Sequence, residues 1–162
     1  MRGTVAALAV AASACARPGP AADARVQAAA VRELFVAREH ARQLVLWADP
    51  DETGPTFELL GAHDARADLR ALASAIPLPV RPVRAADLAQ LFRAHPDGWA
   101  AFYAAHPGAP GLVELARPAW SGDTLATVVV GRACGEHCFN AWRVTVHRGR
   151  VVATAPLRLP KS

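Results

Sequence analysis

Two cysteines near the C-terminus are the residues in this sequence best suited to chemistry. Cys134 and Cys138 enclose Gly135, Glu136 and His137, and strand-forming sequence lies on both sides of the segment. The five residues are therefore predicted to form the loop of a β-hairpin. A disulfide here would close a five-residue loop and fix the turn, and Gly135 allows the backbone to bend.

Redox activity and metal binding are the alternative functions of this loop. Redox-active pairs usually have two intervening residues at the start of a helix, where the helix dipole lowers a thiol pKa, whereas here three residues intervene on a hairpin. Copper or zinc could bind Cys134, His137 and Cys138, but a fourth ligand would have to come from elsewhere in the chain. We favour a structural disulfide between Cys134 and Cys138, and we expect no metal and no cofactor.

The N-terminus has the organisation of an export signal. Arg2 provides a positive start, and residues 5–12 form an apolar run that is too short to span a bilayer. The segment Ala12-Ser13-Ala14-Cys15 then supplies the small residues that a signal peptidase requires. It resembles the lipobox of bacterial lipoproteins, which are cut before the cysteine and acylated on it.

The lipobox resemblance implies a signal peptide over residues 1–14 and a lipid on Cys15, followed by a short spacer that completes residues 15–22. Three cysteines is an odd number, and a lipid on Cys15 leaves an even pair for a disulfide in an oxidising compartment. Because Ala16 rather than an aspartate follows the cysteine, the resemblance to lipoproteins also implies sorting to the outer membrane. Plain secretion as a soluble periplasmic protein, with Cys15 unmodified, is the other interpretation.

The composition is typical of a folded globular protein. Hydrophobic residues make up 52% and charged residues 20% of the 162 residues, which suits a single domain over residues 23–162. The net charge of +4 is compatible with anionic lipid headgroups, an anionic envelope polymer or an envelope protein as partner. Nucleic acid is not expected as a partner outside the cytoplasm.

Helical patterns occupy the N-terminal and central parts of the chain. The predicted helices span residues 23–39, 64–76, 87–95 and 97–106. An aspartate stands at or near the start of each, where its side chain can accept hydrogen bonds from the first free backbone amides: Asp23, Asp64, Asp87 and Asp97. The last of these helices carries an aromatic stripe, which we expect to pack against a sheet.

Strand patterns dominate the C-terminal part. The predicted strands span residues 42–48, 57–60, 112–116, 124–132, 139–147 and 150–155, and residues 57–60 are predicted to form a hairpin with 42–48. Prolines keep residues 77–82 extended. Alternation of Trp142, Val144 and Val146 with polar residues predicts one buried face. We therefore predict an α+β fold, with N-terminal and central helices packed on a C-terminal antiparallel β-meander.

Residues 99–152 also resemble a family of uncharacterised exported bacterial proteins. The residues that carry the likeness are Trp99, Phe102, Tyr103, Pro107, Gly108, Gly111, Leu112, Val113, Glu114, Leu115, Cys134, Gly135 and Cys138. In this family an aromatic helix is followed by a Pro-Gly turn and a Cys-Gly hairpin. The resemblance implies an α+β domain and no particular substrate.

The remaining polar groups give no catalytic motif. Asp49, Asp51 and Gly54 match the opening of a calcium loop, but Leu60 stands where a bidentate glutamate is needed, so a solvated turn is expected. Six histidines are scattered through the chain without a metalloprotease spacing: His40, His63, His95, His106, His137 and His147.

Two smaller groupings are weaker candidate sites. His95 and His106 flank the aromatic helix and could converge with Asp97, although capping and surface roles suit them better. Basic residues around the last hairpin could bind an anion, although a solvated face is the usual role of such a run: Arg143, His147, Arg148 and Arg150. The sequence thus predicts a non-catalytic, lipid-anchored interaction domain, with a metal-binding or thiol-redox protein as the alternative.

Overall fold

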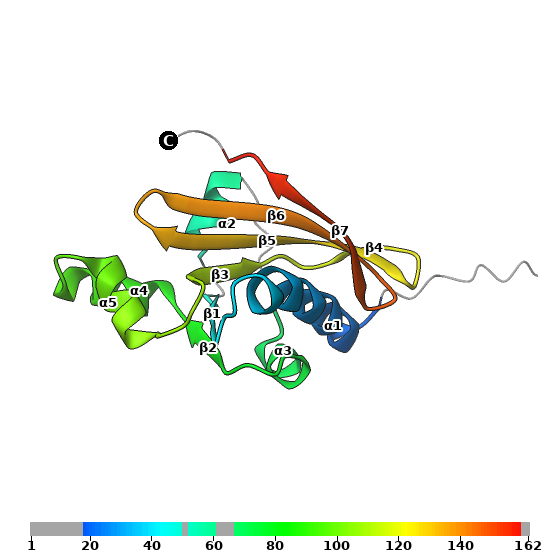
Figure 1. Cartoon of the computed structure of the whole chain (residues 1–162), viewed down its shortest axis with the longest axis horizontal. Helices are drawn as coiled ribbons and strands as arrows, with labels where there is room; N and C mark the ends of the chain where they lie inside the picture. The colour runs from blue at the N-terminus through cyan, green and yellow to red at the C-terminus, as the bar shows by residue number, and fades with distance from the viewer. Residues whose placement is uncertain (1–17, 50–51, 61–66, 160–162) are drawn as a thin grey trace, which may run out of the picture.

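The computed structural model describes residues 18–49, 52–60 and 67–159, and these residues form an α+β fold (Figure 1). The helices are α1 (Pro20–Val31), its π-helical continuation η1 (Arg32–Ala37), α2 (Pro55–Leu60), α3 (Leu69–Ala75), α4 (Ala85–Ala94) and α5 (Gly98–Ala105). The strands are β1 (Leu44–Trp47), β2 (Val80–Val83), β3 (Leu112–Leu115), β4 (Ala119–Ser121), β5 (Leu125–Gly135), β6 (Cys138–His147) and β7 (Arg150–Leu157). No helix in these residues is long and apolar enough to cross a membrane.

The strands form one mixed sheet in the order β2-β1-β3-β5-β6-β7, and β4 pairs with the first residues of β5. The predicted antiparallel meander is confirmed, since β5, β6 and β7 pair in succession. The sheet also contains parallel pairs that the sequence did not predict: β1 pairs in parallel with both β2 and β3.

Helices cover both faces of the sheet. α1 packs with α3 against a cluster that includes Val128 and Val144, and the small side chains of α1, such as Ala28 and Ala30, are fully buried there. Successive strand residues point to opposite faces, so Val45 instead joins the second cluster, in which Phe102 of α5 is buried. β1 therefore has apolar side chains on both of its faces, as expected for a strand that helices cover on both faces of the sheet.

The first helix begins earlier than predicted. α1 starts at Pro20 with Gly19 as the N-cap residue, because a proline suits the first helical position. The predicted cap, Asp23, lies inside the first turn. Its carboxylate instead accepts a hydrogen bond of 2.7 Å from the indole of Trp120 and forms an ion pair with Arg117.

Residues 57–60 do not form the predicted strand. They belong to α2, whose first amides are held by a carboxylate from β3 that the local sequence does not reveal. Asp64, the predicted cap of the next helix, lies outside the described residues, and Asp68 caps α3. Asp97 caps α5 as predicted, and its side chain accepts from Ala100 N at 2.9 Å.

α4 begins at Ala85 with Arg84 as the N-cap residue, so Asp87 lies near the start of the helix as predicted. Asp87 is the third residue of the helix, and its carboxylate accepts from Arg84 N at 3.4 Å. The short strand β4 was not predicted.

Candidate functional site

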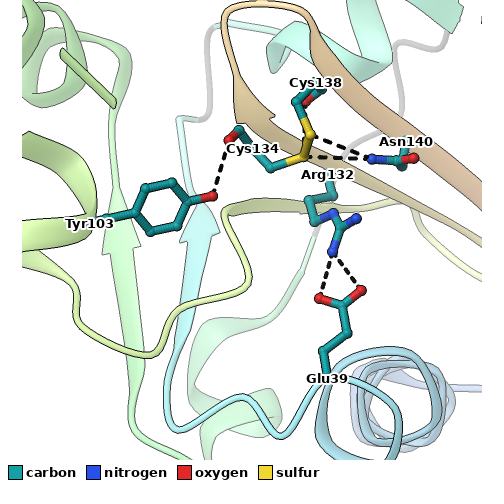
Figure 2. A network of polar contacts seen from close by, with 6 residues as sticks. All are labelled: Glu39, Tyr103, Arg132, Cys134, Cys138 and Asn140. Atoms are coloured by element: carbon teal, nitrogen blue, oxygen red, sulfur yellow. Dashed lines mark hydrogen bonds and ion pairs between the residues drawn. A yellow bond between two sulfur atoms is a disulfide. The ribbon is translucent and has the colours of Figure 1, made fainter. Parts of the chain in front are cut away.

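The cysteine segment forms the loop of the β5–β6 hairpin, as predicted. Cys134 and Cys138 are joined by a disulfide, with their α-carbons 5.0 Å apart (Figure 2). The pairing shifts by one residue between Ala133 and Gly135, so Cys134 sits at a β-bulge. The disulfide and the bulge together give the end of this hairpin a fixed shape.

A tyrosine joins the hairpin to the helical part of the domain. The hydroxyl of Tyr103, from α5, donates to the carbonyl oxygen of Cys134 at 3.1 Å (Figure 2). Burial raises the pKa of Tyr103, so this hydroxyl keeps its proton and remains a donor at neutral pH. Trp99 and Tyr103 pack with buried Phe102 in the cluster that contains the strand residues Val45 and Leu112, so the aromatic stripe of α5 packs against the sheet as predicted.

Asn140 lies against the two sulfur atoms. Its side-chain nitrogen is 3.5 Å from Sγ of Cys134 and 3.9 Å from Sγ of Cys138 (Figure 2). Sulfur in a disulfide is a weak acceptor, so these contacts contribute little while the bond is closed. They would become charge-assisted hydrogen bonds if a thiolate formed at either cysteine.

Arg132, on β5, connects the sheet to Glu39, which lies just after the end of η1. Its guanidinium lies 2.5 and 2.6 Å from the two carboxylate oxygens of Glu39. It also lies over the ring of Trp142 at 5.3 Å and near that of Phe35 at 5.9 Å, both within cation–π range. Arg132 is therefore a structural link rather than a free cation.

The structure does not bring a metal site together at this loop. In the described part of the chain, no group of three or more His, Cys, Asp or Glu side chains could hold a metal ion. Glu136 and His137 are exposed on the loop. Both cysteine sulfurs are committed to each other.

Glu114 is a fully buried carboxylate on β3, and nothing in the sequence pointed to it as a site residue. Its two oxygens accept from the backbone amides of Thr56 at 2.8 Å and Phe57 at 2.9 Å, at the start of α2. A side chain at Gly54 would overlap Glu114, so this position requires glycine. Burial raises the pKa of Glu114, and the two amide hydrogen bonds oppose that rise.

The turn that resembles the opening of a calcium loop makes structural hydrogen bonds in this fold. The carboxylate of Asp49 accepts from the amides of Glu52 at 3.2 Å and Ala85 at 3.1 Å, which ties the loop after β1 to the start of α4. Gly54 lies against Glu114, and Asp51 falls outside the described residues.

The histidines flanking α5 do not converge on Asp97. The ring of His106 packs at a tilt against that of Phe102, with ring centroids 4.9 Å apart, and burial together with the charge of Arg81 lowers the pKa of His106. Asp97 caps α5, and none of the described hydrogen bonds or ion pairs joins it to His95 or His106. Asp97 and His106 therefore have structural contacts within α5, and His95 is exposed.

The basic residues of the last hairpin do not form one cluster, because the fold places them on different parts of the surface. Arg143 is exposed on the outward face of β6, and His147 pairs with Arg150 at the end of the β6–β7 ladder. Arg148 lines a hollow at the start of α1, whereas Arg150 lines a separate one beside the end of that helix. Cys15 lies outside the described residues.

Comparison with protein-family models, curated proteins and solved structures finds no match to this chain. The resemblances to bacterial lipoproteins and to the exported Cys-Gly hairpin family therefore stay predictions.

Proposed function

We propose that this chain is a non-catalytic, lipid-anchored binding domain of the bacterial cell envelope, held by an acylated Cys15 and facing the periplasm from the outer membrane. The support comes first from the N-terminus, where an apolar run is followed by Ala12-Ser13-Ala14-Cys15. Only a few residues separate Cys15 from Pro20, where α1 begins. A lipid on Cys15 would keep that end of the domain at the membrane surface.

The single observation that carries the binding role is the position of the cysteine hairpin relative to that end. β5 runs from the α1 end to the disulfide loop, a length of about 33 Å at the usual rise per strand residue. Figure 1 shows β4 and the β6–β7 turn at one end of the sheet, and the β5–β6 turn at the other. An anchor at α1 therefore presents the hairpin away from the membrane.

The hairpin is built as a rigid presenting element. Its loop is closed by the disulfide, and its backbone is held by Tyr103, while Glu136 and His137 at the tip are exposed. A preorganised loop loses little conformational entropy when it binds a partner. We infer that an envelope protein or an anionic envelope polymer is bound at this end.

Intact-mass analysis of the protein isolated from membranes tests the anchor. We expect the chain to begin at Cys15, with a mass increase equal to a diacylglycerol and an amide-linked acyl chain. A Cys15→Ser variant should no longer carry this modification. A mature protein with an unmodified Cys15 in the soluble fraction would refute the anchor.

Photo-crosslinking in cells tests the binding end. A photoreactive amino acid at position 136 should give one defined crosslinked product, and the same group at position 143, on the exposed middle of β6, serves as the matched control. Equal products from the two positions would argue against a binding surface at the hairpin.

A thiol-redox function is the second candidate, and the position of Asn140 beside both sulfurs favours it. An external dithiol would supply two electrons and two protons, giving two thiols on Cys134 and Cys138 and a disulfide in the reductant. Hydrogen bonding from Asn140 would then stabilise a thiolate and lower its pKa. Thiol titration of protein isolated without reductant separates the functions, because two free thiols would favour redox chemistry and none would favour the structural disulfide.

A further inference from the structure

A hollow lies at the end of the domain where α1 begins. It has a volume of about 320 Å³ and is bordered by the first turns of α1, the β4–β5 turn and the β6–β7 turn. Pro18, Val26 and Val146 give it an apolar side, and Trp120 forms part of its wall. The indole of Trp120 is held in place by its hydrogen bond to Asp23.

Two arginines face this hollow from different elements. Arg25 comes from α1 and Arg148 from the β6–β7 turn, and both are exposed. Neither guanidinium has a hydrogen bond or ion pair to any described residue. Among the described residues that line the hollow, Asp123 supplies the one carboxylate, so the lining is positively charged overall. Guanidinium groups match the geometry of phosphate oxygens.

The backbone at Arg148 is unusual for an arginine. Its φ is +49°, in the left-handed region, and the following Gly149 has a φ of +76°. Two-residue turns of this kind favour asparagine or aspartate followed by glycine. The amide of Arg148 donates to the carbonyl oxygen of Thr124 at 2.8 Å, which fixes the turn against the start of β5. The turn therefore holds an arginine at the edge of the hollow, although asparagine or aspartate would suit this backbone conformation better.

The hollow is also close to the proposed anchor. Pro18 lines it and follows Cys15 by three residues, which can span at most about 11 Å even when fully extended. A tryptophan beside basic residues is a typical arrangement at a membrane interface. Anionic headgroups attract basic residues near the membrane surface.

We propose that this hollow binds the phosphate of an anionic phospholipid headgroup, with Arg25 and Arg148 holding the phosphate oxygens and the apolar side receiving the glycerol and the first acyl carbons. This inference rests on the proposed anchor, which would hold the hollow at the bilayer surface. It explains why two cations without a partner in the described part of the chain lie beside an apolar wall. The same phosphate chemistry is present in free phosphate, and the experiment separates the two sources.

The test uses the purified full chain in neutral detergent, titrated with dihexanoylphosphatidylglycerol below its micelle concentration while tryptophan fluorescence is recorded. We expect a saturable change that is lost in a Trp120→Phe variant. Arg25→Gln and Arg148→Asn should each weaken the apparent affinity about tenfold, because each removes one charged hydrogen-bonding group. Asn is compatible with the left-handed turn, so misfolding would not account for the loss at position 148.

Controls define what would overturn the proposal. Arg143→Gln, which removes an exposed arginine outside the hollow, should keep the wild-type affinity. An equal response to dihexanoylphosphatidylcholine, an equal loss in Arg143→Gln, or no saturable response would refute the site. Equally tight binding of inorganic phosphate would refute the lipid source. The titration does not require an acylated Cys15, so its failure and the failure of the anchor are separate results.

Discussion

The side chain of Glu114 reaches from β3 to the start of α2, where each of its two carboxylate oxygens accepts a hydrogen bond from a backbone amide. A buried carboxyl group is unfavourable unless its hydrogen bonds are made, and here the first two amides of a short helix make them. The amides benefit equally, since the first turn of a helix has no partners of its own. This one residue therefore joins the sheet to a helix that covers its second face.

Replacement of Glu114 by alanine should reduce the free energy of unfolding by about 3 kcal/mol, because two buried amides lose their acceptor and a cavity remains. Urea denaturation followed by circular dichroism measures the change. Glu58→Ala, which removes an exposed glutamate of the same helix, is the matched control and should change stability by less than about 0.5 kcal/mol. Similar effects of the two substitutions would contradict this role of Glu114.

The raised pKa of Glu114 also predicts a dependence of stability on pH. Its ordinary value is 4.5, so between 4.5 and the higher folded value the folded protein keeps a proton that the unfolded chain releases. This contribution to stability is fully present below the unfolded value and is lost as the pH rises through the folded value. Relative to a Glu114→Gln variant, the wild type should lose stability in urea denaturation as the pH rises from 4.5 through the higher folded pKa of Glu114. A constant difference between the two proteins over this range would exclude the effect.

The sequence could not have identified Glu114. Its position in a run of apolar residues, Leu112 to Leu115, predicts a buried strand, but its partners Thr56 and Phe57 lie in the first half of the chain. The cysteines were identifiable, because their pairing depends on neighbours within one hairpin. Local contacts leave a pattern in the sequence, whereas contacts between distant segments do not.

The same distinction between local and distant contacts explains which helices and strands were predicted. Asp97 caps α5 because its partner, Ala100, is three residues away. The segment of α2 has strand-like residues but becomes a helix, since Pro55 suits a helix start and Glu114 holds the first amides. Asp23 does not cap the first helix, because its carboxylate accepts a hydrogen bond from Trp120. Trp120 belongs to β4, a strand that was not predicted.

The disulfide should stabilise the β5–β6 hairpin by a modest amount. A Cys134→Ser, Cys138→Ser double variant should lose about 2 kcal/mol of unfolding free energy, because the closed five-residue loop restricts the unfolded chain modestly. Thermal denaturation without reductant measures the loss. The wild type with reductant should show a comparable loss, and an unchanged stability in both would mean that the disulfide does not stabilise this hairpin.

The two proposals together assign a function to each end of the whole molecule. The α1 end carries the hollow with Arg25 and Arg148, and the opposite end carries the disulfide loop together with α4 and α5 (Figure 1). The α+β class and the antiparallel meander follow from the order of helical and strand patterns along the chain. The parallel pairing of β1 could not be predicted, because its partners β2 and β3 are separated from it by several helices.

Fluorescence energy transfer tests this orientation. A fluorescent amino acid at position 123 should transfer energy to acceptor-labelled lipid headgroups more efficiently than one at position 136, because the strand between the two turns spans about 33 Å. The measurement uses the acylated protein in vesicles. Equal transfer at both positions would mean that the domain lies flat on the membrane.

The parallel pairs of β1 have a consequence for how the chain acquires its structure. Val45 pairs with Arg81 of β2 on one side and with Leu112 of β3 on the other, so the centre of the sheet cannot close until β3 has been synthesised. Pairing of distant segments slows folding, because loop entropy is lost before the contacts form. The proposed export would require the chain to reach the translocation channel unfolded, and this topology delays completion of the sheet until residues 112–115 have been synthesised.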